Sequence, residues 1–378
     1  MKDKISANIE AHFGHIEDPR HTYLNDHPLI NIITIALCAI IAGAEGWSDV
    51  QMFGQQKKEW LSRFLDLKNG IPSHDTFGRV FARLDPEQFQ QSFLSWVQAV
   101  FAVTGGQVIA VDGKELRRSH DKGLGKRAIR MISAWATANR IVLGQQKVAK
   151  RSSEITAIPK LLKLLDISGC IVTIDAIGTQ TKIAAQIIKQ DADYLLPVKE
   201  NQTHLLEDIA LFFELAEKDG FAKVGHTYHR TVDNNHGRME IRECWAIDGA
   251  DNLDFLRGAA EWPGLQTIVR IRSERRLKRK TEVKTRYFIT SLANDARQIL
   301  AAKRAHWGIE NSLHWVLDVA FREDDSRVRQ GNADQNLAIL RQIALNLLKQ
   351  EKTARGGIKA KRLQAGWNED YLIKVLAG

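Results

Sequence analysis

The chain has 378 residues, of which 44% are hydrophobic and 26% are charged, with 7 prolines and 26 glycines. This length favours two or more structural units, and the composition excludes a largely disordered chain, because such chains bury too little apolar surface. Lysine and arginine number 54 against 45 acidic residues, which gives a formal net charge of +9. A basic balance favours a polyanionic partner, usually nucleic acid, although many basic proteins bind none.

Cysteine usage and hydropathy indicate the compartment. Cys38, Cys170 and Cys244 lie far apart, a pattern that predicts a reduced, cytoplasmic protein without a disulfide framework. No apolar run follows Met1 promptly, so we expect no signal peptide. The most apolar run, 29–44, is shorter than the ~20 residues that a bilayer span requires. We therefore expect it to form a buried helix and expect no membrane contact.

The first hundred residues are predicted to be helical. Apolar residues recur at helical spacing within 29–41, Ser73 stands as an N-cap before a second apolar stripe, and Asp85 with Pro86 opens a third. The glycine pair at 105–106 marks a boundary.

Beyond this boundary short apolar runs alternate with helical segments. The pattern predicts an α/β fold with a mixed or parallel sheet that is covered on both faces. The expected strands are 108–112, 131–137, 141–148, 171–175 and 194–198, and the expected helices are 155–165 and 181–190. From about 225 to 291 the helical period disappears, and further strands are expected at 224–232, 238–247, 266–273 and 285–291. Helices are expected again at 294–321, 332–349 and 367–376.

Two aspartates stand at matching places in this pattern. Asp112 and Asp175 each end a short apolar run, and ligands gather at the carboxyl edge of the strands in open α/β sheets. Carboxylates brought together there repel each other, and a divalent cation such as Mg²⁺ relieves the repulsion. The alternative is that each aspartate only caps the turn that follows it, and the residue pattern alone does not choose.

A third acid, Glu310, lies in the helix predicted at 294–321. His306 and His314 are four residues to either side of it, so the three side chains share one helix face. This face has three interpretations: a His/Glu/His transition-metal site, a solvated or core-edge surface, or a catalytic carboxylate that completes a site with the two aspartates.

Two runs of basic residues fit a polyanionic ligand. The segment 270–286 holds nine lysines and arginines, and another run, from Lys114 to Arg130, follows directly on Asp112. A solvated charged hairpin is the ordinary explanation for either run. Two runs, one of them beside a candidate metal-binding aspartate, favour phosphate contacts close to the chemistry.

At this point the sequence resembles a known family over nearly its whole length, the H-repeat-associated insertion-sequence transposases of the DDE superfamily. The resemblance rests on the order and number of these segments: Ala42-Gly-Ala-Glu-Gly-Trp-Ser-Asp-Val, Ser73-His-Asp-Thr-Phe, Val111-Asp-Gly-Lys-Glu-Leu-Arg, Ile174-Asp-Ala-Ile-Gly-Thr-Gln, Tyr194-Leu-Leu-Pro-Val-Lys-Glu-Asn-Gln, His236-Gly-Arg-Met-Glu-Ile-Arg, His306-Trp-Gly-Ile-Glu-Asn-Ser-Leu-His-Trp and Leu317-Asp-Val-Ala-Phe-Arg-Glu-Asp.

The resemblance implies a ribonuclease-H-like catalytic core, with Asp112, Asp175 and Glu310 as catalytic and metal-binding residues. It implies an N-terminal helical domain at 1–104, a core at 105–203 and 291–349, a β-rich insertion at 204–290 and a basic C-terminal tail at 350–378. Two Mg²⁺ ions, for which Mn²⁺ is a substitute, would serve the cutting of a DNA strand and the attack of its 3′-OH on target DNA. The implied partners are double-stranded DNA, as terminal inverted repeats and as target, and a second copy in a homodimer on DNA. The implied location is the bacterial cytoplasm, at the nucleoid when DNA is bound.

DNA contacts are expected from basic residues in the two runs and in the family segments: Lys114, Arg117, Arg118, Lys199, Arg238, Arg275, Arg276, Lys278, Arg304, His306 and His314. The helix of Glu310 departs from related groups, which have Tyr-x-x-Arg-x-x-x-Glu and then Lys seven residues after the Glu. Lys303, His306 and Leu317 occupy those places. Lys303, Arg304, His306 and His314 remain alternatives for a phosphate contact from this helix.

Three other functions compete with transposition. The first alternative is a DNA-binding remnant of a transposon that no longer transposes. The second is a plain Mg²⁺-dependent nuclease with the same core, and the third is a basic scaffold protein. The intact acids at all three positions argue against loss of chemistry. A strand-transfer product separates a transposase from a nuclease, and a scaffold would show no dependence on metal ions.

Overall fold

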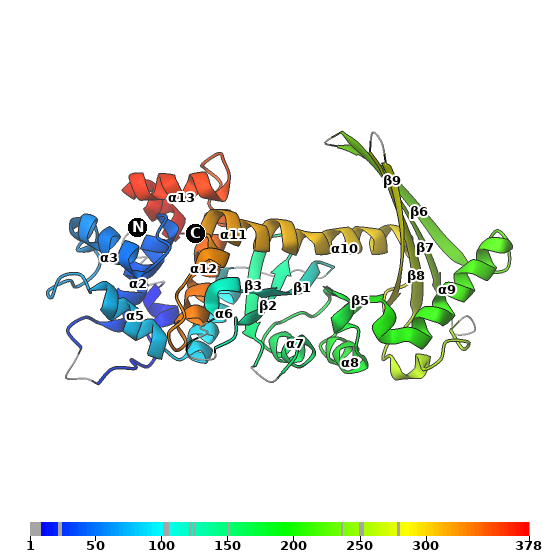
Figure 1. Cartoon of the computed structure of the whole chain (residues 1–378), viewed down its shortest axis with the longest axis horizontal. Helices are drawn as coiled ribbons and strands as arrows, with labels where there is room; N and C mark the ends of the chain where they lie inside the picture. Colours follow the sequence, from blue (N-terminus) through cyan, green and yellow to red (C-terminus); the bar gives the residue numbers. More distant parts are fainter. Residues whose placement is uncertain are drawn as a thin grey trace.

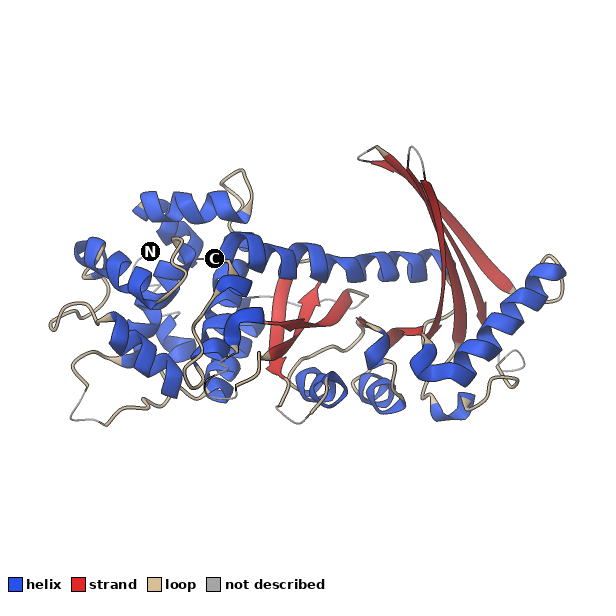
Figure 2. Ribbon diagram, viewed as in Figure 1, coloured by secondary structure: helices blue, strands red, loops and turns tan. Residues whose placement is uncertain are grey.

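The structure is a computed structural model that describes residues 9–21, 25–100, 106–120, 123, 126–149, 152–235, 237–248, 253–277 and 280–377. The molecule is elongated (Figure 1). Helices gather at one end, a sheet occupies the middle and long strands form the other end. The same arrangement is visible by element type in Figure 2. Within the described residues, none of the helices combines the length and the apolarity that a bilayer span requires.

The helical end is built from both ends of the chain. Its N-terminal helices begin where the sequence predicts, and Ser73 caps one of them by accepting a hydrogen bond from the Thr76 amide at 3.2 Å. The helices are α2 (Leu29–Ile41), α3 (Trp47–Gln56), α4 (Lys58–Leu61), α5 (His74–Arg83), α6 (Pro86–Val100), α12 (Ala333–Gln350), α13 (Ile358–Trp367) and α14 (Glu369–Ala377). Helix α12 packs against α2, α5 and α6, and α13 and α14 also pack on α2.

The segment predicted as a basic tail is therefore folded into this helical end. The Arg362 side chain on α13 is 4% exposed and donates hydrogen bonds to the Ile40 carbonyl at 2.8 and 3.0 Å and to the Ala44 carbonyl at 3.0 Å. Lys361 is also buried and donates to the Leu348 carbonyl at 3.0 Å. Both side chains bind backbone carbonyls, so their charges are not displayed to an outside ligand.

In the part of the chain that the structure describes, nine strands form one sheet that runs from the middle of the molecule to its far end, in the order β3-β2-β1-β4-β5-β9-β8-β7-β6. The strands are β1 (Val108–Glu115), β2 (Arg130–Ala136), β3 (Ile141–Lys147), β4 (Ile171–Ile174), β5 (Asp193–Val198), β6 (His226–Asn235), β7 (Arg238–Asp248), β8 (Thr267–Leu277) and β9 (Lys280–Thr290). β1, β4 and β5 are parallel neighbours, and the remaining pairs are antiparallel. The sheet is mixed, as the sequence predicts.

The region predicted as a β-rich insertion differs from the expectation in two respects. It begins with a helix that the sequence analysis did not predict, α9 (Thr203–Lys218). Its four strands also extend the central sheet, since β9 pairs with β5 from Leu195 opposite Thr290 to Val198 opposite Tyr287. The expected strands are present, but the backbone hydrogen bonds of the core continue into them without a break.

One long helical segment lies across the sheet and reaches the β6–β9 strands (Figure 1). It comprises α10 (Ala296–Ile309), a π-helical turn (Glu310–His314) and α11 (Trp315–Phe321). α10 packs on β1, β4 and β5 and also on β6 and β7. Two further helices, α7 (Glu154–Lys163) and α8 (Thr181–Lys189), lie below the sheet in Figure 1.

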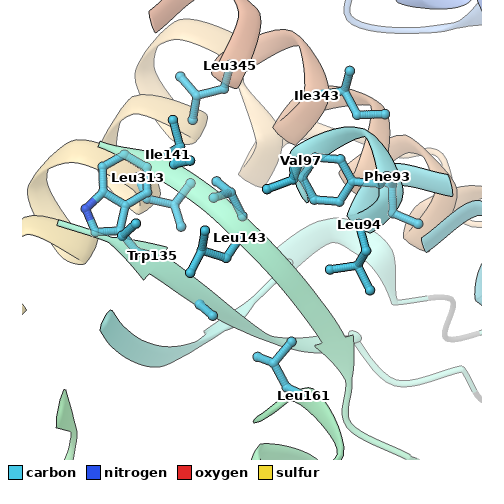
Figure 3. Close-up of a cluster of buried hydrophobic side chains, with 14 of the residues drawn as sticks. Phe93, Leu94, Val97, Trp135, Ile141, Leu143, Leu161, Leu313, Ile343 and Leu345 are labelled. Carbon is cyan, nitrogen blue, oxygen red and sulfur yellow. The ribbon is translucent and has the colours of Figure 1, made fainter. Parts of the chain in front are cut away.

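The hydrophobic core joins the sheet to the helical end. Figure 3 shows Phe93 and Val97 of α6 and Ile343 of α12 gathered on one side of β2 and β3, with Leu161 of α7 on the other side. Leu313 from the π-helical turn lies beside Trp135 of β2 in the same view, and both side chains are fully buried. This contact holds the π-helical turn against the sheet, next to β1.

Candidate active site

The two aspartates come from the adjoining parallel strands β1 and β4. Val111 lies opposite Ile174 in the last pair of their register, so Asp112 and Asp175 are the next residue on each strand. Asp175 directly follows β4, as predicted. Asp112 does not end its strand, because β1 continues to Glu115 through antiparallel pairing with β2 on its other side.

Each aspartate also makes a local backbone contact. Asp112 Oδ1 accepts a hydrogen bond from the Gly113 amide at 2.9 Å, and Asp175 Oδ1 accepts one from the Ile177 amide at 3.2 Å. The second contact is the turn cap that the sequence left open as an alternative. A carboxylate has two oxygens, and one such bond leaves the other oxygen available to a ligand.

Glu310 is the first residue of the π-helical turn. π-helical turns within α-helices occur frequently at functional sites, because they shift the side chains that follow by a fraction of a turn. In this turn His314 Nδ1 lies 3.1 Å from Glu310 Oε2 and 3.6 Å from Asp112 Oδ2. The imidazole of His314 is buried, and these two distances place it between an acid of the sheet and an acid of the helical segment.

The three predicted acids line one cavity of about 350 Å³, which we call the acid cavity. Ligand atoms of two of these acids, Asp112 and Glu310, and of His314 all lie within 4.8 Å of one another. Asp175 lines the same cavity but is outside that closer group. The remaining wall includes the apolar side chains of Leu195, Pro197, Phe288 and Ile309 and the basic side chains of Lys199, Arg286 and Lys303.

The pKa of Asp112 reflects repulsion from the other two acids. Burial raises the pKa of Asp112, and the charges of Asp175 and Glu310 raise it further, against an opposing effect of His314 and the Gly113 amide. Among the residues that the structure describes, no lysine or arginine pairs with any of the three acids. A divalent cation with hard oxygen ligands would relieve this repulsion. Carboxylate oxygens are ligands for a divalent metal ion, and Asp112, Asp175 and Glu310 would supply them here.

His306 does not join this group, although it shares a helix face with Glu310. Its Nδ1 lies 3.0 Å from the Thr173 hydroxyl on β4, and burial lowers the pKa of its imidazole. The structure therefore does not form the His/Glu/His arrangement that the spacing allowed. His306 lines the wall of the acid cavity, whereas His314 contacts its acids.

A second acidic group lies close by, and we call it the Lys114 cluster: Lys114, Asp318, Glu323, Asp324 and Arg341. Lys114 Nζ binds Asp318, and it lies 2.9 Å from Glu323 and 3.7 Å from Asp324. Burial lowers the pKa of Lys114, but Glu323 and Asp318 outweigh burial and raise it overall. The Lys114 side chain is only 12% exposed. The geometry therefore argues against the prediction that Lys114 contacts DNA, because acids of the same chain already pair with its charge.

The other basic residues expected at DNA fall into separate places. Lys199 is exposed at the acid cavity. Arg238, Arg275 and Arg304 line a second cavity of about 520 Å³ between β7, β8, β9 and α10, which we call the basic groove. Arg276 does not line this groove and pairs with Glu274.

Arg117 and Arg118 lie in a third location, beside the helical end. Arg117 is paired with Asp324 at 3.2 Å and Arg118 with Asp325 at 3.5 Å, and both side chains are at least half exposed. Lys278 lies outside the described residues.

The structure adds an acid that sequence reasoning missed, Glu154. It is the first residue of α7, and a Cβ built on Gly113 would lie 2.5 Å from its Oε1. Burial raises the pKa of Glu154, and the nearby charges of Asp175 and Asp112 raise it further. Only Gly113 hinted at this contact, because the position after Asp112 leaves no room for a side chain beside Glu154.

Comparison with known proteins adds to this geometry. Residues 104–347 match the family described as Transposase DDE domain, and residues 10–97 match a family described as DDE_Tnp_1-associated. The chain belongs to the DDE transposase family. The family match covers all three acids of the cavity.

Relatives of this DDE family member match along nearly its whole length. The H repeat-associated protein YhhI of Escherichia coli K12 is 40% identical over 375 residues, which is 98% of either chain. The protein YncI of Escherichia coli O157:H7 is 41% identical over 367 residues, 96% of this chain and 92% of its own. A shorter protein named inactive transposase YbfQ, from Escherichia coli K12, is 39% identical over 75 residues, 20% of this chain and 89% of its own.

One solved structure also aligns with the chain, a piggyBac transposase in a synaptic complex with hairpin DNA. The alignment covers 99% of this chain and 78% of that one, with a TM-score of 0.41 and 12% identity.

Proposed function

We propose that this chain is a DNA transposase that cuts phosphodiester bonds at the ends of an insertion sequence and joins the freed 3′-OH to target DNA. The observation that carries the proposal is the acid cavity. Asp112, Asp175 and Glu310 reach one cavity from two strands and a helix, and no lysine or arginine among the described residues neutralises them. Membership of the DDE transposase family supports the same function.

We also propose that β1 to β5 with α7, α8 and α10 form a ribonuclease-H-like core. The strand order β3-β2-β1-β4-β5, with only β1, β4 and β5 parallel, supports this assignment. The domain boundaries at 104, 203, 290 and 349 stay predictions, as does a homodimer on DNA.

The chemistry follows from the residues that surround the cavity. Bound Mg²⁺ would activate the attacking oxygen and stabilise the leaving 3′ oxygen. Asp112, Asp175 and Glu310 supply carboxylate ligands, and the strand register fixes the first two side by side. Lys199, Arg286 and Lys303 supply positive charge that attracts and orients the phosphate. In the first step water attacks the scissile phosphorus and the P–O3′ bond breaks. In the second, the freed 3′-OH attacks a target phosphorus, a new P–O3′ bond forms, and the P–O3′ bond of the target strand breaks and releases a target 3′-OH.

The deciding experiment uses a supercoiled plasmid that carries the ends of the element. The protein is incubated with it in Mg²⁺ or in EDTA, and the DNA ends are mapped. We expect Mg²⁺-dependent cuts at the element's ends and joined products in target DNA. Cuts without joined products would identify a plain nuclease. Binding to the ends without cuts would identify a remnant that no longer transposes, and binding unaffected by EDTA with no reaction would fit a scaffold protein.

A further inference from the structure

The acid cavity and the basic groove meet at three side chains. Arg286 of β9 and Lys303 and Trp307 of α10 line both cavities. The basic groove has seven lysines and arginines on its walls against three glutamates. A ligand that runs along the groove must therefore pass these three side chains before it reaches the catalytic acids.

Three arginines of the groove form ion pairs with acids of the same chain. Arg304 pairs with Asp233 at 2.9 Å, and Arg242 pairs with Asp233 at 2.6 Å and with Glu240. Arg238 pairs with Glu240 at 2.9 Å. These three arginines are held in place by ion pairs with two carboxylates, which offset part of their charge before any ligand arrives.

Lys303 and Arg286 differ from these arginines. Within the part of the chain that the structure describes, no carboxylate pairs with either side chain, although both are half-buried. The charges of Arg286, Arg242 and Arg304 repel the ammonium group of Lys303. Burial, together with repulsion from these arginines, lowers the pKa of Lys303 to about 8.

A half-buried ammonium among guanidinium groups is unfavourable unless an anion offsets the repulsion. Three acids line the same cavity, but no carboxylate among the described residues pairs with either cation, so the anionic oxygens of a ligand would offset the repulsion. Two cations held side by side by a strand and a helix suit the oxygens of a phosphate. Trp307 is 53% exposed at the same junction and offers a ring on which a base can stack, which favours nucleic acid over a simple anion.

We infer that Lys303 and Arg286 form a binding site for a backbone phosphate of the DNA strand, next to the phosphate that is cut at the acid cavity. This inference rests on the proposed function, because it assigns the strand that the acids cut to the junction of groove and cavity. It also selects Lys303, and not its neighbour Arg304, as the phosphate contact of α10. Arg304 is already engaged by Asp233.

The first test is protection of Lys303 from acetylation. The whole protein is treated with a limiting amount of an acetylating reagent near pH 8, with and without a short mixed-sequence DNA duplex, and each lysine is quantified by peptide mass spectrometry. We expect DNA to reduce the labelling of Lys303 several-fold and to leave exposed Lys189 of α8 unchanged. Equal labelling of Lys303 with and without DNA would overturn the inference. No variant has to fold for this measurement.

The second test is the dependence of binding on salt. Affinity for the same duplex is measured by fluorescence anisotropy over a series of salt concentrations for the wild type, Lys303→Met and the control Arg297→Gln, an exposed residue of the same helix. Loss of one phosphate contact lowers the slope of log affinity against log salt by about one. We expect this change for Lys303→Met alone. A slope equal to that of the wild type in a variant with an unchanged unfolding transition would contradict the inference.

The outcomes separate this inference from the proposed function. Mg²⁺-dependent cleavage and joining of DNA without protection of Lys303 would support the transposase and contradict the phosphate site. Protection of Lys303 in a protein that never cleaves DNA would keep the phosphate site and remove the proposed chemistry.

Discussion

The acid cavity and the Lys114 cluster lie close to each other, and their carboxylates differ in the groups that balance their charge. Asp112 and Glu310 belong to the acid cavity, where His314 is the only basic side chain that the structure pairs with them among its described residues. Lys114, two residues further along β1, binds Asp318 and Glu323 in the Lys114 cluster.

The comparison shows which acids are structural. Carboxylates that contact a lysine of their own chain are already compensated, and removing one partner exposes the rest. In the acid cavity, burial and the charges of Asp175 and Glu310 raise the pKa of Asp112, and an added cation would relieve this repulsion. We therefore expect clustered acids to bind a cation where no lysine or arginine of the same chain pairs with them.

The largest expected effect separates the two groups by activity. Asp175→Asn and Glu310→Gln each remove a negative oxygen ligand and keep the side-chain shape, so DNA cleavage in Mg²⁺ should fall by several orders of magnitude. Asp318→Asn, in the Lys114 cluster, is the matched control and should retain most cleavage. Plasmid cleavage assays measure all three. Normal cleavage by Asp175→Asn together with loss in Asp318→Asn would reverse the assignment.

For the free energy of unfolding, we expect the larger loss from a substitution in the Lys114 cluster and the smaller loss from one in the acid cavity. Glu323 is 3% exposed and lies near both Lys114 and Arg341, whose Nη1 is 3.9 Å away. Glu323→Gln leaves those buried cations less compensated, so the free energy of unfolding should fall by about 3–5 kcal/mol. Urea unfolding measures the change. Glu310→Gln, whose acid has no lysine or arginine partner, should leave stability nearly unchanged. Equal losses in both variants would remove the distinction.

Glu351 sharpens the comparison, because hydrogen bonds stabilise this carboxylate. Burial acts to raise its pKa, but hydrogen bonds from Thr353, Tyr371 and the Ala354 amide outweigh burial and lower the pKa to about 2. A folded-state pKa below the unfolded value gives stability that is present above the unfolded pKa of 4.5 and lost as the pH falls toward 2.

Glu351→Gln should therefore reduce the free energy of unfolding by roughly 1.5–3 kcal/mol at neutral pH. The difference from the wild type should shrink as the pH falls from about 4.5 toward 2. Urea titrations at several pH values test this. A difference that stays constant over that range would show that the charge of Glu351 contributes nothing.

The acid cavity should respond to metal ions in a way that the Lys114 cluster does not. Asp112→Asn removes a charge that Asp175 and Glu310 repel, so without divalent ions it should stabilise the chain by on the order of 1 kcal/mol. Mg²⁺ should raise the melting temperature of the wild type and have less effect on Asp112→Asn. Thermal unfolding in Mg²⁺ and in EDTA measures both. An equal Mg²⁺ response in the two proteins would exclude Asp112 as a ligand.

The smallest effects on function are expected from substitutions in the hairpin of β8 and β9, which should change the affinity for DNA. Arg275 lines the basic groove, whereas Arg276 does not line it and is paired with Glu274. Arg275→Glu should weaken DNA binding and reduce its salt dependence more than Arg276→Glu does. Both substitutions are exposed and should change stability by less than ~0.5 kcal/mol. Anisotropy titrations with a DNA duplex decide. Equal weakening by both would show that the groove does not direct the DNA.

Much of the fold was predictable because the relevant signals are local. Hydrophobic period and capping at Ser73 predict the N-terminal helices, and short apolar runs predict the strands that carry Asp112 and Asp175. The helix α9 was missed, as was the continuation of the central sheet into β9. Strand pairing between β5 and β9 joins segments about ninety residues apart, and no local pattern specifies that partner.

For the site, the sequence by itself predicted the three acids, through their places after short apolar runs and in a helix and through the resemblance of the motifs around them. Only the tertiary structure decided which charges are available to a ligand. Lys114 and Arg304 look alike in the sequence as basic residues near the chemistry, yet both are paired with acids of their own chain, whereas Lys303 is not paired with any acid that the structure describes. The reason is that net charge and motif are properties of residues, whereas neutralisation depends on distances between side chains that are far apart in the chain.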